Sequence, residues 1–243
     1  MNTKAKGYLL GAVAAATYGM NPLFALPLYK DGMDPDSVLL FRYLFAIPLL
    51  GAMLKLRGRD FKLHRREIPP LIVLGLLVAF SSLSLFLSYN YMDAGIASTL
   101  LFIYPIFVAL IMAVGFHERL SPQTLWCILL ALGGIGLLYR SGGGTTLNLT
   151  GTLFVMGSAL SYAIYIIGVN RPRLQSVATL KITFYILLFG LSLFLLRLKF
   201  GTDVILPGRG SLLANLLALA VFPTAIPCPF PTLALSHTRP TPT

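Results

Sequence analysis

The sequence predicts an all-α, polytopic membrane protein. Of its 243 residues, 56% are hydrophobic and only 11% are charged, whereas a soluble domain carries about 25% charged residues. The mean hydropathy is +0.81. The apolar residues gather into eight segments, most of them close to the ~20 residues that a membrane-spanning helix needs. The chain is therefore expected to cross a membrane several times.

The predicted helices follow one another with short polar connections. In chain order they cover residues 7–28, 37–56, 68–89, 94–116, 121–139, 151–169, 177–196 and 211–226. The first follows two lysines and lacks a convincing cleavage site, so we expect it to be retained as a helix. The last carries a cluster of prolines at its end, and a proline costs ~3 kcal/mol in a helix interior. That helix should therefore end near Pro223.

The fourth and fifth segments form the part of the chain around which the others are organised. The fourth contains Tyr104-Pro105, and a charged hairpin with Glu118 and Arg119 leads into a fifth segment rich in glycine. Pro105 removes a backbone donor, so the carbonyl four residues earlier loses its partner. In a bilayer such a break is tolerated only where protein or a water-lined cavity satisfies the backbone again. The pattern predicts a helix that faces a cavity, a tight turn, and a helix packed through its glycines.

The charges in the connections predict the orientation of the chain. Residues 55–67 hold six basic side chains, whereas residues 30–36 hold one. Basic residues collect in cytoplasmic loops, so the 55–67 loop, the N-terminus and the 117–119 hairpin are expected in the cytoplasm. The connection that holds Arg197 and Lys199 falls on the opposite side and runs against this rule.

Parts of the sequence recur at a nearly constant offset. The segment that begins at Gly7 aligns with the one at Gly151, an offset of 144, and the segment at Leu74 aligns with the one at Leu216, an offset of 142. The repeating unit holds five helices, an odd number, so its two copies must have opposite orientations. Inverted repeats of this kind form transporters that bind substrate at the repeat interface. We expect repeats over 1–140 and 141–243, the second truncated, with about eight of ten helices present.

Several short motifs resemble those of the drug/metabolite transporter superfamily, and within it the ten-helix EamA-type permeases. The matching residues are Tyr18-Gly19-Met20-Asn21-Pro22, Phe41-Arg42-Tyr43, Ala97-Ser98-Thr99, Tyr104-Pro105 and Glu118-Arg119-Leu120-Ser121-Pro122. The resemblance implies an inner-membrane permease of bacterial type, with a cytoplasmic N-terminus and two inverted five-helix repeats, that moves a small organic metabolite or drug by alternating access. It extends over residues 7 to about 226, and the incomplete second repeat is the point of departure.

Two polar residues inside predicted helices are candidates for substrate binding. Arg42 lies about five residues into the second predicted helix. Its long side chain either reaches back to the membrane surface or faces a cavity, where it would attract anionic groups. Asn21 lies beside Pro22, and a structural hydrogen bond and a substrate contact remain equal alternatives. Pro22 and Pro105 are expected to have structural or gating roles.

Tyrosines form the other group of candidates. Tyrosines in membrane helices are usually interfacial anchors. Tyr18 and Tyr162 each lie eleven residues after the glycine that begins their segment, about 16 Å along a helix, so we expect them to line a cavity together with Tyr165 and Tyr104. Glu118 and Arg119 are expected to cap or tether helix ends, with proton coupling as the alternative for Glu118.

The sequence contains no pattern that favours an enzyme. We found no HExxH, no GxSxG and no paired carboxylates, and we expect neither a metal nor a cofactor. The basic residues fall in short loops between apolar segments, so lipid and a small-molecule substrate are the expected partners, and nucleic acid is not. Whether the chain forms a homodimer is left open. The alternatives to a permease are a remnant that does not transport, and a membrane-embedded enzyme or partner protein.

Overall fold

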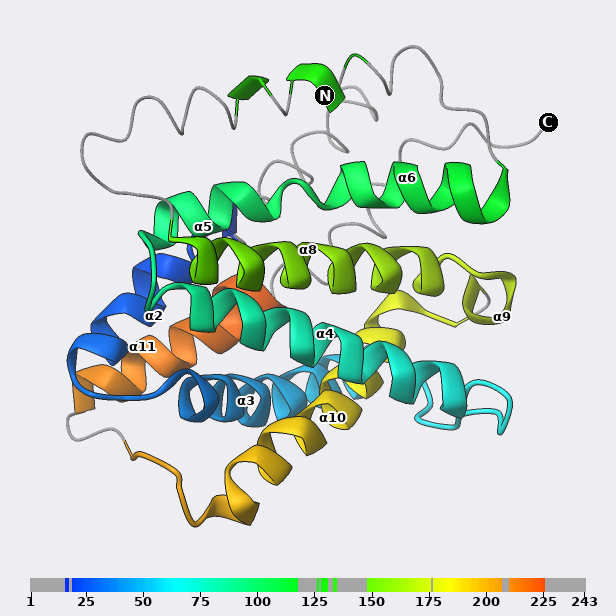
Figure 1. The fold of residues 1–243 in the computed structure, drawn as a ribbon. Helices are drawn as coiled ribbons and strands as arrows, with labels where there is room; N and C mark the ends of the chain where they lie inside the picture. Colours follow the sequence, from blue (N-terminus) through cyan, green and yellow to red (C-terminus); the bar gives the residue numbers. More distant parts are fainter. Residues whose placement is uncertain are drawn as a thin grey trace, which may run out of the picture. The chain divides into compact units, whose positions relative to one another are not determined.

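The computed structural model describes residues 16–17, 19–117, 126, 128–130, 133–134, 148–175, 177–206 and 210–225. Throughout these ranges the regular structure is helical, which confirms the all-α prediction (Figure 1). The helices are α2 (Asn21–Lys30), α3 (Pro35–Leu56), α4 (Ile68–Ser88), α5 (Ala94–Leu101), α6 (Tyr104–Phe116), α8 (Leu149–Val169), α9 (Pro172–Gln175), α10 (Thr179–Arg197) and α11 (Gly210–Ala220), with a 3₁₀ turn η1 (Lys199–Gly201) and a π-helical turn η2 (Val221–Ala225).

Five helices in the described ranges are long and apolar enough to cross a membrane. They are Pro35–Leu56, Ile68–Ser88, Ala94–Phe116, Leu149–Val169 and Thr179–Arg197. A shorter apolar helix covers Leu212–Thr224, where the sequence predicted a helix over 211–226. The predicted helix at 121–139 lies largely outside the described residues, and the described part of the one predicted at 7–28 includes α2 (Asn21–Lys30). The chain is a multi-pass membrane protein by the length and composition of these helices.

Polar side chains begin three of the helices. The Asp34 side chain accepts a hydrogen bond from the Ser37 backbone N–H at the start of α3. Asp93 does the same for two N–H groups of α5, at 2.8 and 3.1 Å, and Asn148 accepts from Thr150 at the start of α8. The first N–H groups of a helix have no partner inside it, and an Asp or Asn cap supplies one. These caps explain why the apolar segments begin where they do.

The chain divides into two compact units. Unit 1 comprises Met1–Gly75 and Leu174–Thr243, and unit 2 comprises Leu76–Arg173. Each unit takes residues from both sides of residue 140, so neither coincides with a predicted sequence repeat. The division into repeats over 1–140 and 141–243 stays a prediction.

Unit 1 is built on the antiparallel pair of α3 and α10, which lie side by side (Figure 1). Arg197 at the end of α10 pairs with Asp36 at the start of α3, and Lys181 near the start of α10 pairs with Asp60 just beyond the end of α3. Between these ends the two helices meet through apolar contacts such as the ring of Tyr43 against that of Phe194. α11 packs against both α2 and α3, and the first part of α4 approaches α10 at Gly75.

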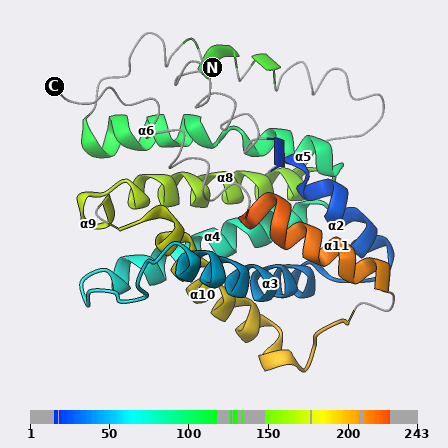
Figure 2. The ribbon, with the colours of Figure 1, turned by 180° about the vertical axis from the view of Figure 1, so that it is seen from behind.

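Unit 2 places α8 against α5 and α6 (Figure 2). The later part of α4 contacts α8 through two buried serines. Ser81 donates its hydroxyl to the Ser158 carbonyl at 2.9 Å, and Ser158 donates to the Ser81 carbonyl at 2.7 Å. Small hydroxyl residues of this kind let two membrane helices approach closely and bond across the contact.

Gly75 provides a test of the packing in unit 1. A Cβ at this position would lie 2.8 Å from the Ile186 carbonyl oxygen and 3.1 Å from the Gly190 nitrogen, both backbone atoms. We predict that Gly75→Ala lowers the stability of the purified protein by about 1–3 kcal/mol, the usual cost of overpacking. The change should appear as a lower thermal unfolding midpoint in detergent.

Gly157→Ala is the matched control. Its Cβ would meet nothing within 4 Å, and alanine is the better helix former, so this variant should keep or raise the unfolding midpoint. Equal midpoints for the two variants would contradict the close contact at Gly75.

Candidate functional site

Arg42 lies inside unit 1. It is the eighth residue of α3, roughly 10 Å from the start of the helix, because α3 begins at Pro35 and not at the predicted residue 37. Only 7% of the residue is exposed, and its Nε donates to the Thr224 hydroxyl at 2.9 Å. The Arg42 side chain is thus buried among residues of unit 1, and both roles considered for it stay predictions.

Thr224 binds Arg42 because of a break in the backbone next to it. Pro223 has no N–H and cannot donate to the carbonyl four residues earlier, which is that of Leu219. The Thr224 hydroxyl donates to this carbonyl at 3.2 Å and accepts from Arg42. A proline in η2 therefore fixes the hydroxyl that orients the guanidinium. A hydrogen bond to a charged group contributes about 1.5–3 kcal/mol, so this short chain of bonds holds Arg42 firmly.

Asn21 lies on the other helix that borders η2. It is the first residue of α2 and is 2% exposed. One turn further along α2, the Phe24 ring stacks on Phe222 of η2 at a centroid distance of 5.7 Å. Pro22 occupies the second position of α2, directly after a turn at Met20. The structure thus places Asn21 and Arg42 on the two helices that flank η2, and both roles considered for Asn21 stay open.

Three of the predicted tyrosines form one aromatic cluster in unit 2. The rings of Tyr104 and Tyr162 meet edge to face at 4.9 Å, and those of Tyr162 and Tyr165 lie 5.5 Å apart. Tyr104 begins α6, and its neighbour Pro105 follows a break between α5 and α6 that is visible in Figure 1. At the break, Phe102 and Ile103 donate to the Thr99 and Leu100 carbonyls, both at 3.1 Å. The tighter i→i−3 bonds replace part of the helical pattern.

The remaining candidates lie outside the described residues. These are Tyr18, Glu118 and Arg119, so their predicted roles stay predictions.

The ion pair between Asp36 and Arg197 was not predicted from the sequence. Asp36 was expected in a loop, whereas it lies buried in the first turn of α3. Two bonds join its carboxylate to the Arg197 guanidinium, at 2.6 and 3.1 Å. Arg197 was expected on the side of the membrane that disfavours basic residues, and Asp36 supplies the opposite charge there. The acidic residues of the 30–36 connection, expected on the same side of the membrane, could have indicated a partner for Arg197.

The long apolar helices define the chain as an all-α, multi-pass membrane protein. It belongs to the EamA-like transporter family, whose pattern matches residues 5–140. This confirms the resemblance drawn from the motifs.

Relatives in Bacillus subtilis (strain 168) carry only general names. The chain is 27% identical over 213 residues to the uncharacterized transporter YdfC and 26% identical over 177 residues to the uncharacterized transporter YcbK. The alignments cover 81% and 67% of this chain but only 64% and 54% of the relatives, so the chain spans less than two thirds of their length. A solved structure described as "Crystal structure of protein" shares the fold, with a TM-score of 0.71 and 20% sequence identity. The match covers 97% of this chain and 80% of the chain in that structure.

Thr224 provides a test of the bonds around Arg42. We predict that Thr224→Val lowers the stability by about 1–3 kcal/mol, because it removes the donor to the Leu219 carbonyl and the acceptor for Arg42 Nε. Thr224→Ser keeps the hydroxyl and should lose much less. Thermal unfolding of the purified chain in detergent measures both, and identical midpoints for the two variants would show that the hydroxyl does not matter.

Proposed function

We propose that this chain acts as a permease of the inner (plasma) membrane that moves a small organic metabolite or drug carrying an anionic group. The observation that carries the proposal is Arg42, a charged side chain that is buried in α3 and donates to the Thr224 hydroxyl. An arginine inside a membrane helix costs free energy, up to ~2.5–3.5 kcal/mol at the helix centre on insertion scales, and such residues often mark substrate or ion pathways. A carboxylate or phosphate on the substrate would match the planar donors of the guanidinium.

The helix contacts support an inverted-repeat mechanism. Suppose that α2, α3 and α4 of the first repeat correspond, in that order, to α8, α10 and α11 of the second. The counterpart of the contact between α2 and α11 is then the contact between α8 and α4. The first is present in unit 1, and the second is present in unit 2 through Ser81 and Ser158. The same correspondence relates the α3–α11 contact to the approach of α4 to α10 at Gly75. We therefore propose that the two repeats move against each other in alternating access.

The orientation of the chain follows from the same pairing. The loop at 55–67 joins α3 to α4, and its Asp60 pairs with Lys181 near the start of α10. This loop holds six basic residues. The opposite end of the α3–α10 pair holds Asp36, which balances Arg197. We propose that the basic end faces the cytoplasm, in agreement with the preference of cytoplasmic loops for Lys and Arg.

Transport into vesicles tests the role of Arg42. We predict that the chain, reconstituted in lipid vesicles, takes up or exchanges organic anions in a metabolite screen, and that Arg42→Gln lowers the rate by roughly 10–100-fold, the equivalent of losing one or two charged hydrogen bonds. Arg42→Lys should keep part of the activity, since it keeps the charge but not the planar donors. The control is Arg57→Gln, an exposed basic residue just past α3, which should transport normally.

Three outcomes would count against the proposal. Full transport by a folded Arg42→Gln variant would remove Arg42 from substrate binding. Transport confined to cationic or neutral compounds would overturn the anionic substrate class. No transport by the folded chain for any compound in the screen would favour a protein that does not transport.

The tyrosine cluster supplies a second test in unit 2. We predict that Tyr162→Ala lowers transport, because it removes the ring that contacts both Tyr104 and Tyr165. Tyr162→Phe keeps the ring and should transport at nearly the normal rate. Tyr91→Ala is the matched control, because Tyr91 stacks on Phe154 elsewhere in the same unit. Equal loss in Tyr162→Ala and Tyr91→Ala would indicate a general packing effect.

A further inference from the structure

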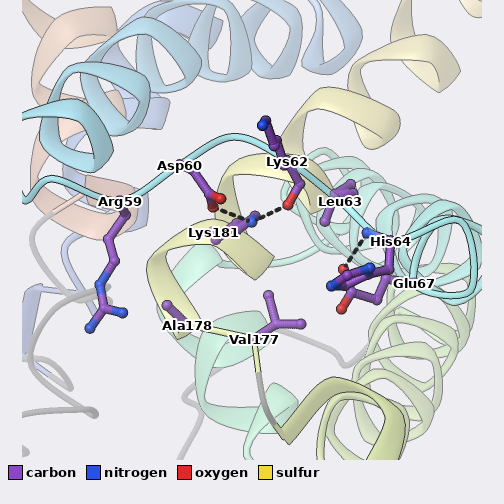
Figure 3. A pocket seen from close by; sticks show the side chains of 9 residues that line it. All are labelled: Arg59, Asp60, Lys62, Leu63, His64, Glu67, Val177, Ala178 and Lys181. Atoms are coloured by element: carbon purple, nitrogen blue, oxygen red, sulfur yellow. Dashed lines mark hydrogen bonds and ion pairs between the residues drawn. The ribbon is translucent and has the colours of Figure 1, made fainter.

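We propose that a pocket in unit 1 binds the phosphate headgroup of an anionic phospholipid. The pocket lies between the α3–α4 loop and the start of α10 (Figure 3). Its volume is about 530 Å³, within the ~300–1,000 Å³ that small-molecule sites occupy. Arg59, Lys62 and His64 line it from the loop, and Lys181 lines it from α10.

Both carboxylates of the pocket are already bound to donors inside it. Asp60 accepts from the Lys181 ammonium at 3.0 Å, and Glu67 accepts from the His64 backbone N–H at 3.0 Å. The hydrogen bond and the charge of Lys181 lower the pKa of Asp60, so this carboxylate stays ionised at neutral pH and stays with Lys181. Lys181 also donates to the Lys62 carbonyl, which fixes the loop against α10.

Arg59 and Lys62 supply the positive charge for a ligand. Within the part of the chain that the structure describes, neither side chain forms an ion pair. Figure 3 shows the Arg59 side chain along one side of the pocket, with His64 and Glu67 on the other. A guanidinium presents planar donors that match a phosphate, and an ammonium adds a second positive charge.

The start of α10 contributes further positive potential. Val177 and Ala178 line the pocket, and Ala178, at the N-cap position of this 19-residue helix, makes no side-chain cap. The positive end of the helix dipole is therefore directed toward the same space as Arg59, where it favours an anion.

The surroundings favour a lipid over a free phosphate ion. The pocket lies where three membrane-spanning helices, α3, α4 and α10, begin or end. Just beyond Glu67, on the second turn of α4, Ile72 and Val73 are exposed and offer an apolar surface along which acyl chains can lie. Basic pockets between membrane helices at the cytoplasmic surface suit anionic lipid headgroups.

Lipid binding to the purified chain tests the proposal. Native mass spectrometry and thermal unfolding would be measured in mild detergent with phosphatidylglycerol, phosphatidylcholine or inorganic phosphate. We expect phosphatidylglycerol to bind and to raise the unfolding midpoint, and the other two to do neither. The double variant Arg59→Gln, Lys62→Gln should bind phosphatidylglycerol roughly tenfold or more weakly, because basic residues near the membrane surface attract anionic lipids.

The matched control is the double variant Arg65→Gln, Arg66→Gln. It removes the same charge from the same loop, but neither residue lines the pocket. All four side chains are exposed, so both variants should fold, and their midpoints without lipid would check this. Equal weakening by both variants would show diffuse attraction and overturn the proposal. Equal binding of phosphatidylcholine would overturn it too. So would binding of inorganic phosphate that persists when phosphatidylglycerol is added.

Discussion

The need to pair every backbone polar group away from water governs this structure. In an apolar chain the helix meets this need, but each proline removes one donor. Next to two of these prolines the hydrogen bonding departs from that of a regular helix in different ways. Near Pro105 the chain tightens into i→i−3 bonds, and near Pro223 the Thr224 hydroxyl bonds to the carbonyl of Leu219. The second solution leaves the hydroxyl oxygen able to accept, and Arg42 uses it. A requirement of the backbone thus becomes the device that positions a buried charge.

The α3–α10 pair separates polar from apolar contacts along its length. Ion pairs tie its two ends, while the middle relies on aromatic and close contacts such as Tyr43 against Phe194 at 5.1 Å. Exposed ion pairs contribute little singly, but the carboxylate of Asp36 is mostly shielded and takes two bonds from Arg197. Any movement of the two predicted repeats against each other would therefore have to break or rearrange the ion pairs that join α3 to α10.

The sequence predicted the features that depend on local composition. Long apolar segments predicted α3, α4, α8 and α10 to within a few residues, and Pro105 correctly indicated a break, which lies between α5 and α6. Contacts between distant residues could not be predicted. Arg42 and Thr224 are 182 positions apart, so periodicity gave Arg42 a place on a helix but no partner. The position of Asp36 was wrong because a helix start depends on its cap, here Asp34, and on the charge that meets it. Tyr104 and Tyr162 were both candidates, but their contact required the packing of α6 on α8.

The division of unit 1 between two distant parts of the chain has a consequence for biosynthesis. Translation proceeds at about 5–20 residues per second, so Thr224 is made about 10–35 s after Arg42, and Arg197 follows Asp36 after a similar interval. During this time α3 has left the ribosome, while α10 and α11 have not yet been made. Until those partners are made, the Asp36 and Arg42 side chains have to be bound by water or by other polar groups. Completion of unit 1, rather than insertion of its first helices, sets the earliest time at which this protein can be native.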